Sequence, residues 1–224
     1  MGVYDAVKSR RSVRNYTDRP VDREVLDRVL TAAARTPSGG NLQPWHTYVV
    51  TGKPHADLVG KMAARLAGGD RGDEPEYPIY PPDLTSPYRE RRFGTGEQLY
   101  SALGIPREDK QARRDWFAGN WSFFGAPVGL FCYIDRAMGS AQWSDVGMYL
   151  QTIMLLLREE GLASCPQEAW SIYHSTVDEV IQPSEGLMLF SGMSIGYEDT
   201  AASGDLFIDR APLAETVNFL GWES

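Results

Sequence analysis

Cysteine and histidine are scarce in this chain. Its 224 residues include two cysteines, Cys132 and Cys165, and three histidines. The cysteines lie in apolar or tight surroundings and do not suggest a disulfide framework, which indicates a reducing compartment. His46, His55 and His174 are not spaced as metal ligands, either with one another or with the cysteines, so no metal site is predicted.

Positive charge is also in short supply. Lysine and arginine number 22 against 30 aspartate and glutamate residues, which gives a net charge of -8. Proteins that bind nucleic acid or anionic membranes normally carry a basic surplus, so neither partner is expected. The uncharged stretch from Val146 to Leu157 is shorter than the roughly 20 residues that a membrane-spanning helix needs. The N-terminus has no apolar signal run, and a cytoplasmic location is expected.

Several nucleotide-binding and catalytic motifs are missing as well. The chain has no GxxxxGK phosphate loop and no GxSxG nucleophile elbow. Gly94-Thr95-Gly96 lacks the third glycine of a dinucleotide fingerprint and does not follow a clear strand. The carboxylates are abundant but dispersed, so they do not indicate an acid–base pair.

The hydrophobic pattern predicts one α+β domain over residues 1–224. Apolar periodicity predicts helices over 2–9, 22–35, 54–67, 142–160 (closed by Gly161) and near 176–181. Runs rich in β-branched and aromatic residues predict strands over 46–51, 127–134 and 187–195. Residues 68–87 lack periodicity and are expected to be irregular surface chain, and 99–117 shows short helical pieces.

A basic cluster, Arg10-Arg11-Ser12-Val13-Arg14, stands near the N-terminus. Guanidinium and hydroxyl donors of this kind bind phosphate, and arginine does so in bidentate fashion. The alternative is an ordinary solvated surface.

A second segment, Pro37-Ser38-Gly39-Gly40-Asn41-Leu42-Gln43-Pro44-Trp45, follows about thirty residues later. Its glycines allow the backbone to approach a planar ligand, and its amide side chains can bond the edge of such a ligand. The alternative is a simple turn before a strand, since the same residues are common in turns. With the basic cluster, the segment predicts a site for a phosphorylated heterocycle.

The two segments, in this order and near this spacing, resemble the flavin-binding signature of the nitroreductase family of FMN-dependent oxidoreductases. The likeness continues through Pro166-Gln167-Glu168-Ala169, Ser194-Ile195-Gly196-Tyr197 and Arg210-Ala211-Pro212-Leu213, and it is strongest to members that reduce nitrobenzoates and other nitroarenes. It implies a nitroreductase-like fold, with a central antiparallel or mixed sheet flanked by helices. It also implies an intertwined homodimer with flavins at the subunit interface, and a variable, substrate-covering excursion at about 68–118.

The resemblance assigns roles residue by residue. The residues that match the phosphate and ribityl contacts are Arg10, Arg11, Ser12, Arg14 and Arg210. Those that match contacts to the partner subunit's flavin are Pro37, Ser38, Gly39, Asn41 and Gln43, while Trp45 is expected in the core. Those that match contacts to the flavin ring are Asn120, Pro166, Gln167, Glu168 and Ala169, with the Glu168 backbone amide facing N5. Cys165 is expected to be a small buried apolar residue, not a nucleophile.

The implied activity is hydride transfer from NADH or NADPH, through FMN, to an aromatic nitro compound or quinone by a ping-pong mechanism. Because the cofactor carries the chemistry, no catalytic side chain is expected. Two alternatives stay open. One is another flavin reaction on the same scaffold, such as reductive dehalogenation or enone reduction, and the other is a flavin-binding or storage protein without turnover.

The substrate is expected to contact the 68–118 excursion. Arg89, Arg91, Arg92 and Tyr100 combine guanidinium groups with aromatic rings, an arrangement suited to a flat aromatic carboxylate. Equally open is a solvated helix face whose arginines balance Glu90 and Glu97.

Overall fold

The computed structural model describes residues 2–201 and 207–222 and has a single four-stranded sheet among them. The strands lie in the order β1 (Trp45–Val50), β2 (Val128–Asp135), β4 (Leu187–Gly196) and β3 (Ala163–Gln167), and every neighbouring pair is antiparallel. The predicted α+β class with a central antiparallel sheet is confirmed. In the described part of the chain, no helix has the length and apolar character to cross a membrane.

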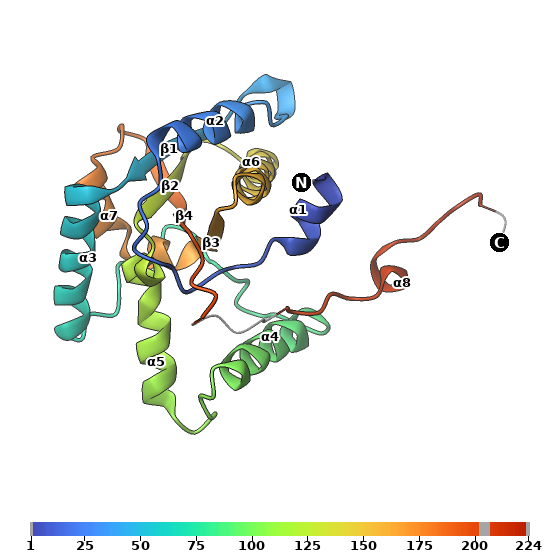
Figure 1. Cartoon of the computed structure of the whole chain (residues 1–224). Coiled ribbons are helices and arrows are strands. Elements are labelled where there is room, and N and C mark those ends of the chain that lie inside the picture. Colours follow the sequence, from blue (N-terminus) through green and yellow to red (C-terminus); the bar gives the residue numbers. More distant parts are fainter. Residues whose placement is uncertain (1, 202–206, 223–224) are drawn as a thin grey trace.

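Helices surround this sheet (Figure 1). The α-helices are α1 (Val3–Ser9), α2 (Arg23–Ala33), α3 (Gly52–Ala67), α4 (Tyr88–Ala102), α5 (Lys110–Ala118), α6 (Ser140–Glu159), α7 (His174–Ile181) and α8 (Leu213–Thr216). Three 3₁₀ segments join them, η1 (Gly39–Asn41), η2 (Gly119–Gly125) and η3 (Glu168–Tyr173). The helices predicted around α1, α2, α3, α6 and α7 are all present, and Gly161 ends α6 with a φ of 75°.

Strand β2 separates two hydrophobic cores. Seven of its eight residues are buried, and alternate side chains point to opposite faces of the sheet, as the pleat requires. Leu130 and Cys132 join α2 and α6 in one core, and Phe131 and Tyr133 join α3, α7 and the 3₁₀ segments in the other. The continuous apolar run of this strand follows from burial on both faces.

Strand β3 was not predicted. The sequence analysis places no strand between residues 134 and 187, yet Ala163–Gln167 pairs with β4 in regular antiparallel register. Pro166 lacks a backbone N–H, and proline is tolerated in a strand at the edge of a sheet. The order of strands places β3 at that edge.

The 68–118 segment is more regular than expected. Residues 68–87 are irregular as predicted, but Tyr88–Ala102 is one continuous helix, and α5 follows it after a short connection. None of the residues of α4 is buried, which explains why the sequence carries little apolar periodicity there. In Figure 1, α4 and α5 project from the body of the protein.

Glycine makes room for the largest buried side chain of the second core. Trp170 is fully buried and lies 4.7 Å from the Phe123 ring and 5.3 Å from the Phe131 ring, between centroids. A Cβ atom at Gly192 would collide with the indole of Trp170. Only glycine at this position of β4 leaves the indole in place.

Substituting Gly192→Ala is expected to lower the free energy of unfolding by about 1–3 kcal/mol, the usual cost of overpacking a core. Gly60→Ala is the matched control, because a Cβ atom at this exposed position of α3 meets nothing within 4 Å. It should raise stability by about 0.5–1 kcal/mol. Urea unfolding measures the free energy of unfolding of both variants. Equal values for Gly192→Ala and Gly60→Ala would contradict the steric account.

A candidate cofactor site beside the edge strand

The N-terminal segment lies along the free edge of β3. The Val13 backbone N–H donates to the Ser164 carbonyl over 3.1 Å, and Ser12 and Ser164 form a parallel β-bridge. The Tyr16 hydroxyl holds the segment down, since it donates to the Val13 carbonyl over 2.8 Å and lies 2.9 Å from the Ser194 hydroxyl. The basic cluster is thereby fixed beside the start of β3.

The far end of β3 leads into the predicted flavin-ring stretch, residues 166–169. A strand advances about 3.3 Å per residue, so Glu168 lies roughly 13 Å along the chain from Ser164. The residues predicted to bind the phosphate therefore lie beside the start of β3, and the backbone predicted to face the flavin ring lies at its end.

A cavity of about 770 Å³ opens beside this edge. Arg10, Arg11, Ser12, Arg14 and Arg210 all line it, although Arg210 is far away in the sequence. Small-molecule sites typically have volumes of about 300–1,000 Å³. The structure thus brings together every residue that was predicted to hold the phosphate and ribityl chain.

The arginines of the cavity differ in their partners. Arg11 forms an ion pair with Glu198. Arg14 lies over the rings of Trp116 and Phe124, at 5.6 and 5.9 Å from their centroids. The side chain of Arg10 has neither an ion pair nor a hydrogen bond within residues 2–201 and 207–222.

Arg10 has no anionic partner among the described residues. Partial burial lowers the pKa of the Arg10 guanidinium, and the positive charge of Arg210 lowers it further. A guanidinium held half-buried beside a like charge is destabilised unless an anion neutralises both. The clustered positive charge is the feature of the cavity that favours an anionic ligand.

An apolar wall faces the arginines. It consists of Thr95, Leu99 and Ala102 of α4, Leu103 directly after that helix, Trp116 of α5, and Phe207 and Ile208 near the C-terminus. The sequence analysis missed these residues. The spacing of Leu99, Ala102 and Leu103 on one helix face was the available signal, but α4 has no buried face to strengthen it.

The stretch 166–169 contains an unsatisfied buried acceptor. The Gln167 side-chain amide donates to the Asn120 carbonyl over 2.8 Å, which joins two residues predicted for the same site. The Gln167 Oε1 atom is buried, and no hydrogen-bond donor reaches it from the described chain. Buried polar atoms are nearly always paired, so this oxygen needs a donor that the described chain does not supply. The lining of the cavity includes none of the five residues predicted to contact the flavin ring, which are Asn120, Pro166, Gln167, Glu168 and Ala169.

The second predicted segment lies elsewhere. Pro37, Ser38, Gly39, Asn41 and Gln43 do not line the cavity of their own chain. All of them except Ser38 are exposed. Two short contacts shape the loop, from the Gly39 N–H to Asp145 Oδ2 at 3.1 Å and from the Gln43 N–H to the Ser38 hydroxyl at 2.9 Å. The loop therefore presents its groups to the outside of the subunit that carries it.

Trp45 and Cys165 behave as predicted. Trp45 is partly buried against the first core and stacks on Tyr149 with centroids 4.5 Å apart. Cys165 is buried, and burial raises the pKa of its thiol, as expected of an inert residue and not of a nucleophile.

The arginines predicted to bind substrate have other partners. Arg89 pairs with Glu90, Arg91 with Glu215 of α8, and Arg92 lies 4.0 Å from the centroid of the Tyr80 ring. Tyr100 is covered by Arg113 at 4.3 Å and touches Trp116 edge-on. The lining of the cavity includes none of Arg89, Arg91, Arg92 and Tyr100. These positions favour the solvated-face interpretation.

Comparison with known proteins gives a consistent picture. Residues 7–197 match the model of the nitroreductase family. The chain is similar to nitrobenzene nitroreductase of Ectopseudomonas oleovorans, at 35% identity over 96% of each chain. It is 39% identical to 4-nitrobenzoate reductase of Nocardioides sp. (strain LMS-CY), over 98% of this chain and 90% of that protein. Among solved structures, the FMN- and NADPH-dependent nitroreductase NfnB from Sphingopyxis sp. strain HMH superposes with a TM-score of 0.95 at 48% identity, covering 99% of this chain and all of that one.

Proposed function

This chain belongs to the nitroreductase family, and on that premise we propose that it is an FMN-dependent reductase that passes hydride from NADPH or NADH to an aromatic nitro compound. The observation that carries the proposal is the pair of guanidinium groups, Arg10 and Arg210, beside the edge strand in a cavity of about 770 Å³. A phosphorylated, elongated and partly aromatic ligand fits both the charge and the apolar wall of this cavity.

The residues present fit FMN. Arg10, Arg210 and the Ser12 hydroxyl offer charge-assisted donors to the phosphate dianion. The buried Gln167 Oε1 offers an acceptor to a ring N–H, and the Glu168 backbone amide offers a donor to the ring. Bound there, FMN supplies the hydride acceptor and donor that the side chains lack. The protein binds and orients the cofactor, and the wall formed by α4 and α5 limits access of water.

A second copy of the chain would complete the site. The exposed loop 37–43 offers the groups that the family places against a partner's flavin, and it lies outside the cavity of its own subunit. The C-terminal segment after α8 carries solvent-exposed apolar side chains, with Leu220 87% and Trp222 81% exposed. It extends away from the body of the protein in Figure 1. Both features support a homodimer in which each subunit covers part of the other.

The substrate space is proposed to be apolar and aromatic. The cavity-facing residues of the 68–118 excursion are Thr95, Leu99, Ala102, Leu103 and Trp116, none of which is charged. A flat nitroarene can pack against such a wall whether or not it bears a carboxylate. A quinone of similar size fits the same description.

The decisive test of the function is anaerobic mixing of the FMN-loaded protein with NADPH and, separately, NADH. A reductase loses its flavin absorbance rapidly with at least one of the two, and regains it when a nitroarene such as nitrobenzene is added. A storage protein binds FMN with no such bleaching, and that result would overturn the proposal.

Arg10→Ala and Arg210→Ala are each expected to weaken FMN binding by about tenfold or more, since a hydrogen bond to a charged group contributes about 1.5–3 kcal/mol. Arg23→Ala is the control, because that arginine lies in an exposed pair with Asp27 on α2. Flavin fluorescence titration of the apoproteins gives the three dissociation constants. Unchanged affinity in both cavity variants would remove the phosphate assignment.

Arg89→Ala and Arg92→Ala are expected to change kcat/KM for 4-nitrobenzoate and for nitrobenzene by the same factor, about twofold or less, as for other exposed charges. An arginine that binds the carboxylate would instead cost the anionic substrate about 1–3 kcal/mol more than the neutral one. Steady-state kinetics with the two substrates decide between these outcomes, and a selective loss for 4-nitrobenzoate would contradict the apolar-wall account.

A further inference from the structure

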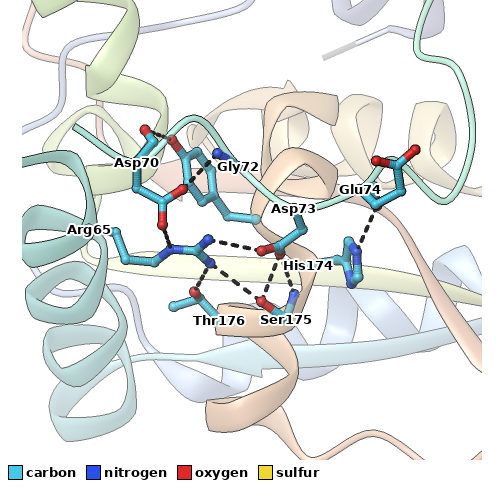
Figure 2. Close-up of polar contacts among 9 residues, drawn as sticks. Arg65, Asp70, Gly72, Asp73, Glu74, His174, Ser175 and Thr176 are labelled. Carbon is cyan, nitrogen blue, oxygen red and sulfur yellow. Dashed lines mark hydrogen bonds and ion pairs between the residues drawn. The ribbon is translucent and has the colours of Figure 1, made fainter. Parts of the chain in front are cut away.

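Arg65 is the centre of a polar network on the far side of the sheet from α2 and α6 (Figure 2). Its guanidinium donates to Asp70 Oδ2 and Asp73 Oδ1, both over 2.9 Å, and to the Thr176 hydroxyl over 2.6 Å. It also lies 4.8 Å from the centroid of the Tyr173 ring. With the Ser175 hydroxyl at 3.4 Å, the planar guanidinium fork reaches four acceptors at once, which an ammonium on a flexible stem does not reproduce.

The network joins an irregular loop to the start of α7. The second oxygen of Asp73 accepts from the Ser175 N–H and hydroxyl, at 2.9 and 2.8 Å. A carboxylate at the first turn of a helix satisfies a free N–H and complements the helix dipole. The side chains of Arg65 and Asp73 are only 24% and 14% exposed, so the pair is shielded from solvent.

The same loop holds the end of η3 through its backbone. The Asp73 N–H donates to the Ile172 carbonyl over 2.7 Å, and the Tyr173 hydroxyl donates to the Asp70 carbonyl over 3.0 Å. Gly72 has a φ of 106°, and a Cβ atom there would collide with Ile172. The loop therefore lies in direct contact with η3 and leaves no room for a side chain between them.

Segment η3 begins at Glu168, the residue whose backbone amide is proposed to face the flavin. A 3₁₀ helix of six residues has few internal hydrogen bonds of good geometry, so its position depends on outside partners. At its start, the outside partner is Trp121, whose indole N–H donates to the Ala169 carbonyl over 3.2 Å. The Arg65 network supplies the corresponding anchors at its end.

We propose that Arg65 is a positioning residue for the flavin: through Asp73 and η3 it fixes the orientation of the Glu168 backbone amide. This inference rests on the proposed function. In oxidised flavin, N5 is a hydrogen-bond acceptor, and in reduced flavin it carries a hydrogen, so a rigidly held backbone N–H aimed at N5 stabilises the oxidised cofactor more than the reduced one. Loosening η3 should therefore alter the redox balance of the flavin more than its binding, because the residues proposed to bind the phosphate lie beside the opposite end of β3.

The charges of the network persist at neutral pH. Burial alone would raise the pKa of Asp73, but the hydrogen bonds from Arg65 and Ser175 outweigh it and hold the pKa below its ordinary value. The hydrogen bond from Arg65 also lowers the pKa of Asp70. Carboxyl groups with lowered pKa values lose their stabilising contribution only as the pH falls through those values, so the anchor is intact wherever the enzyme would operate near neutrality.

Arg65→Ala and the milder Arg65→Lys and Asp73→Asn test the proposal, with Lys61→Ala as the control. Lys61 pairs with Glu179 over 2.8 Å and also joins α3 to α7, but it does not touch η3. In Arg65→Ala, the midpoint potential of bound FMN should rise by about 30 mV, the equivalent of a tenfold stronger preference for reduced flavin in a two-electron couple. Arg65→Lys should recover part of the shift, and Lys61→Ala should show none.

Hydrogen exchange gives a readout that needs no flavin. Amides of residues 168–173 in the FMN-free Arg65→Ala and Asp73→Asn variants should exchange at least about tenfold faster than in the wild type, since local opening becomes easier when anchors are lost. Unchanged potential and unchanged exchange in folded variants would reduce Arg65 to a general stabilising role and overturn the proposal. A wild-type protein that binds no FMN would overturn the proposed function instead, while the exchange result would still decide whether Arg65 anchors η3.

Discussion

The pairing of the N-terminal segment with the edge of β3 is the constraint on which the site depends. One backbone hydrogen bond and one β-bridge, at Val13 and Ser12, set the position of the arginine cluster relative to the strand. The same contact covers a sheet edge that would otherwise expose unpaired backbone groups. Because β3 leads directly into η3, the arginines proposed to bind the phosphate and the backbone proposed to face the flavin ring lie along the same edge of the sheet. A change in this pairing would separate the two.

The cavity concentrates positive charge in a protein whose net charge is -8. Glu198 neutralises Arg11, and the aromatic rings of α5 and η2 cover Arg14, whereas Arg10 has no anionic partner among the described residues, and burial and the charge of Arg210 lower its pKa. Such an arrangement destabilises the empty protein and favours an anionic ligand. Binding of a phosphorylated cofactor should therefore stabilise the fold, since a ligand that binds only the native state shifts the folding equilibrium toward it.

Much of this structure could be predicted from sequence, and the exceptions have physical reasons. Helices with one buried face and strands with apolar runs were identified because burial produces a periodic hydrophobic pattern, and the N-terminal arginines proposed to bind phosphate form a compact motif. Strand β3 escaped detection because its pairing to β4 outweighs the signal of Pro166. The exposed α4 shows no apolar periodicity, so the contact of Arg92 with Tyr80 could not be predicted. The contact of Arg65 with Thr176 joins residues about a hundred positions apart, and no local pattern encodes it.

In this account, the N-terminal arginine cluster and the 37–43 loop of one chain contribute to two different cavities. The arginine cluster lines the cavity of its own subunit, whereas the 37–43 loop faces outward and is proposed to complete the site of a partner. Subunit complementation tests this directly. An Arg10→Ala/Arg210→Ala chain and a Pro37→Glu/Asn41→Asp chain, each poor in FMN alone, are co-expressed with different affinity tags, and the mixed pair is purified. The account predicts one restored flavin per mixed pair, because one of its two sites receives both intact motifs. A mixed pair with no more FMN than its parents would contradict it.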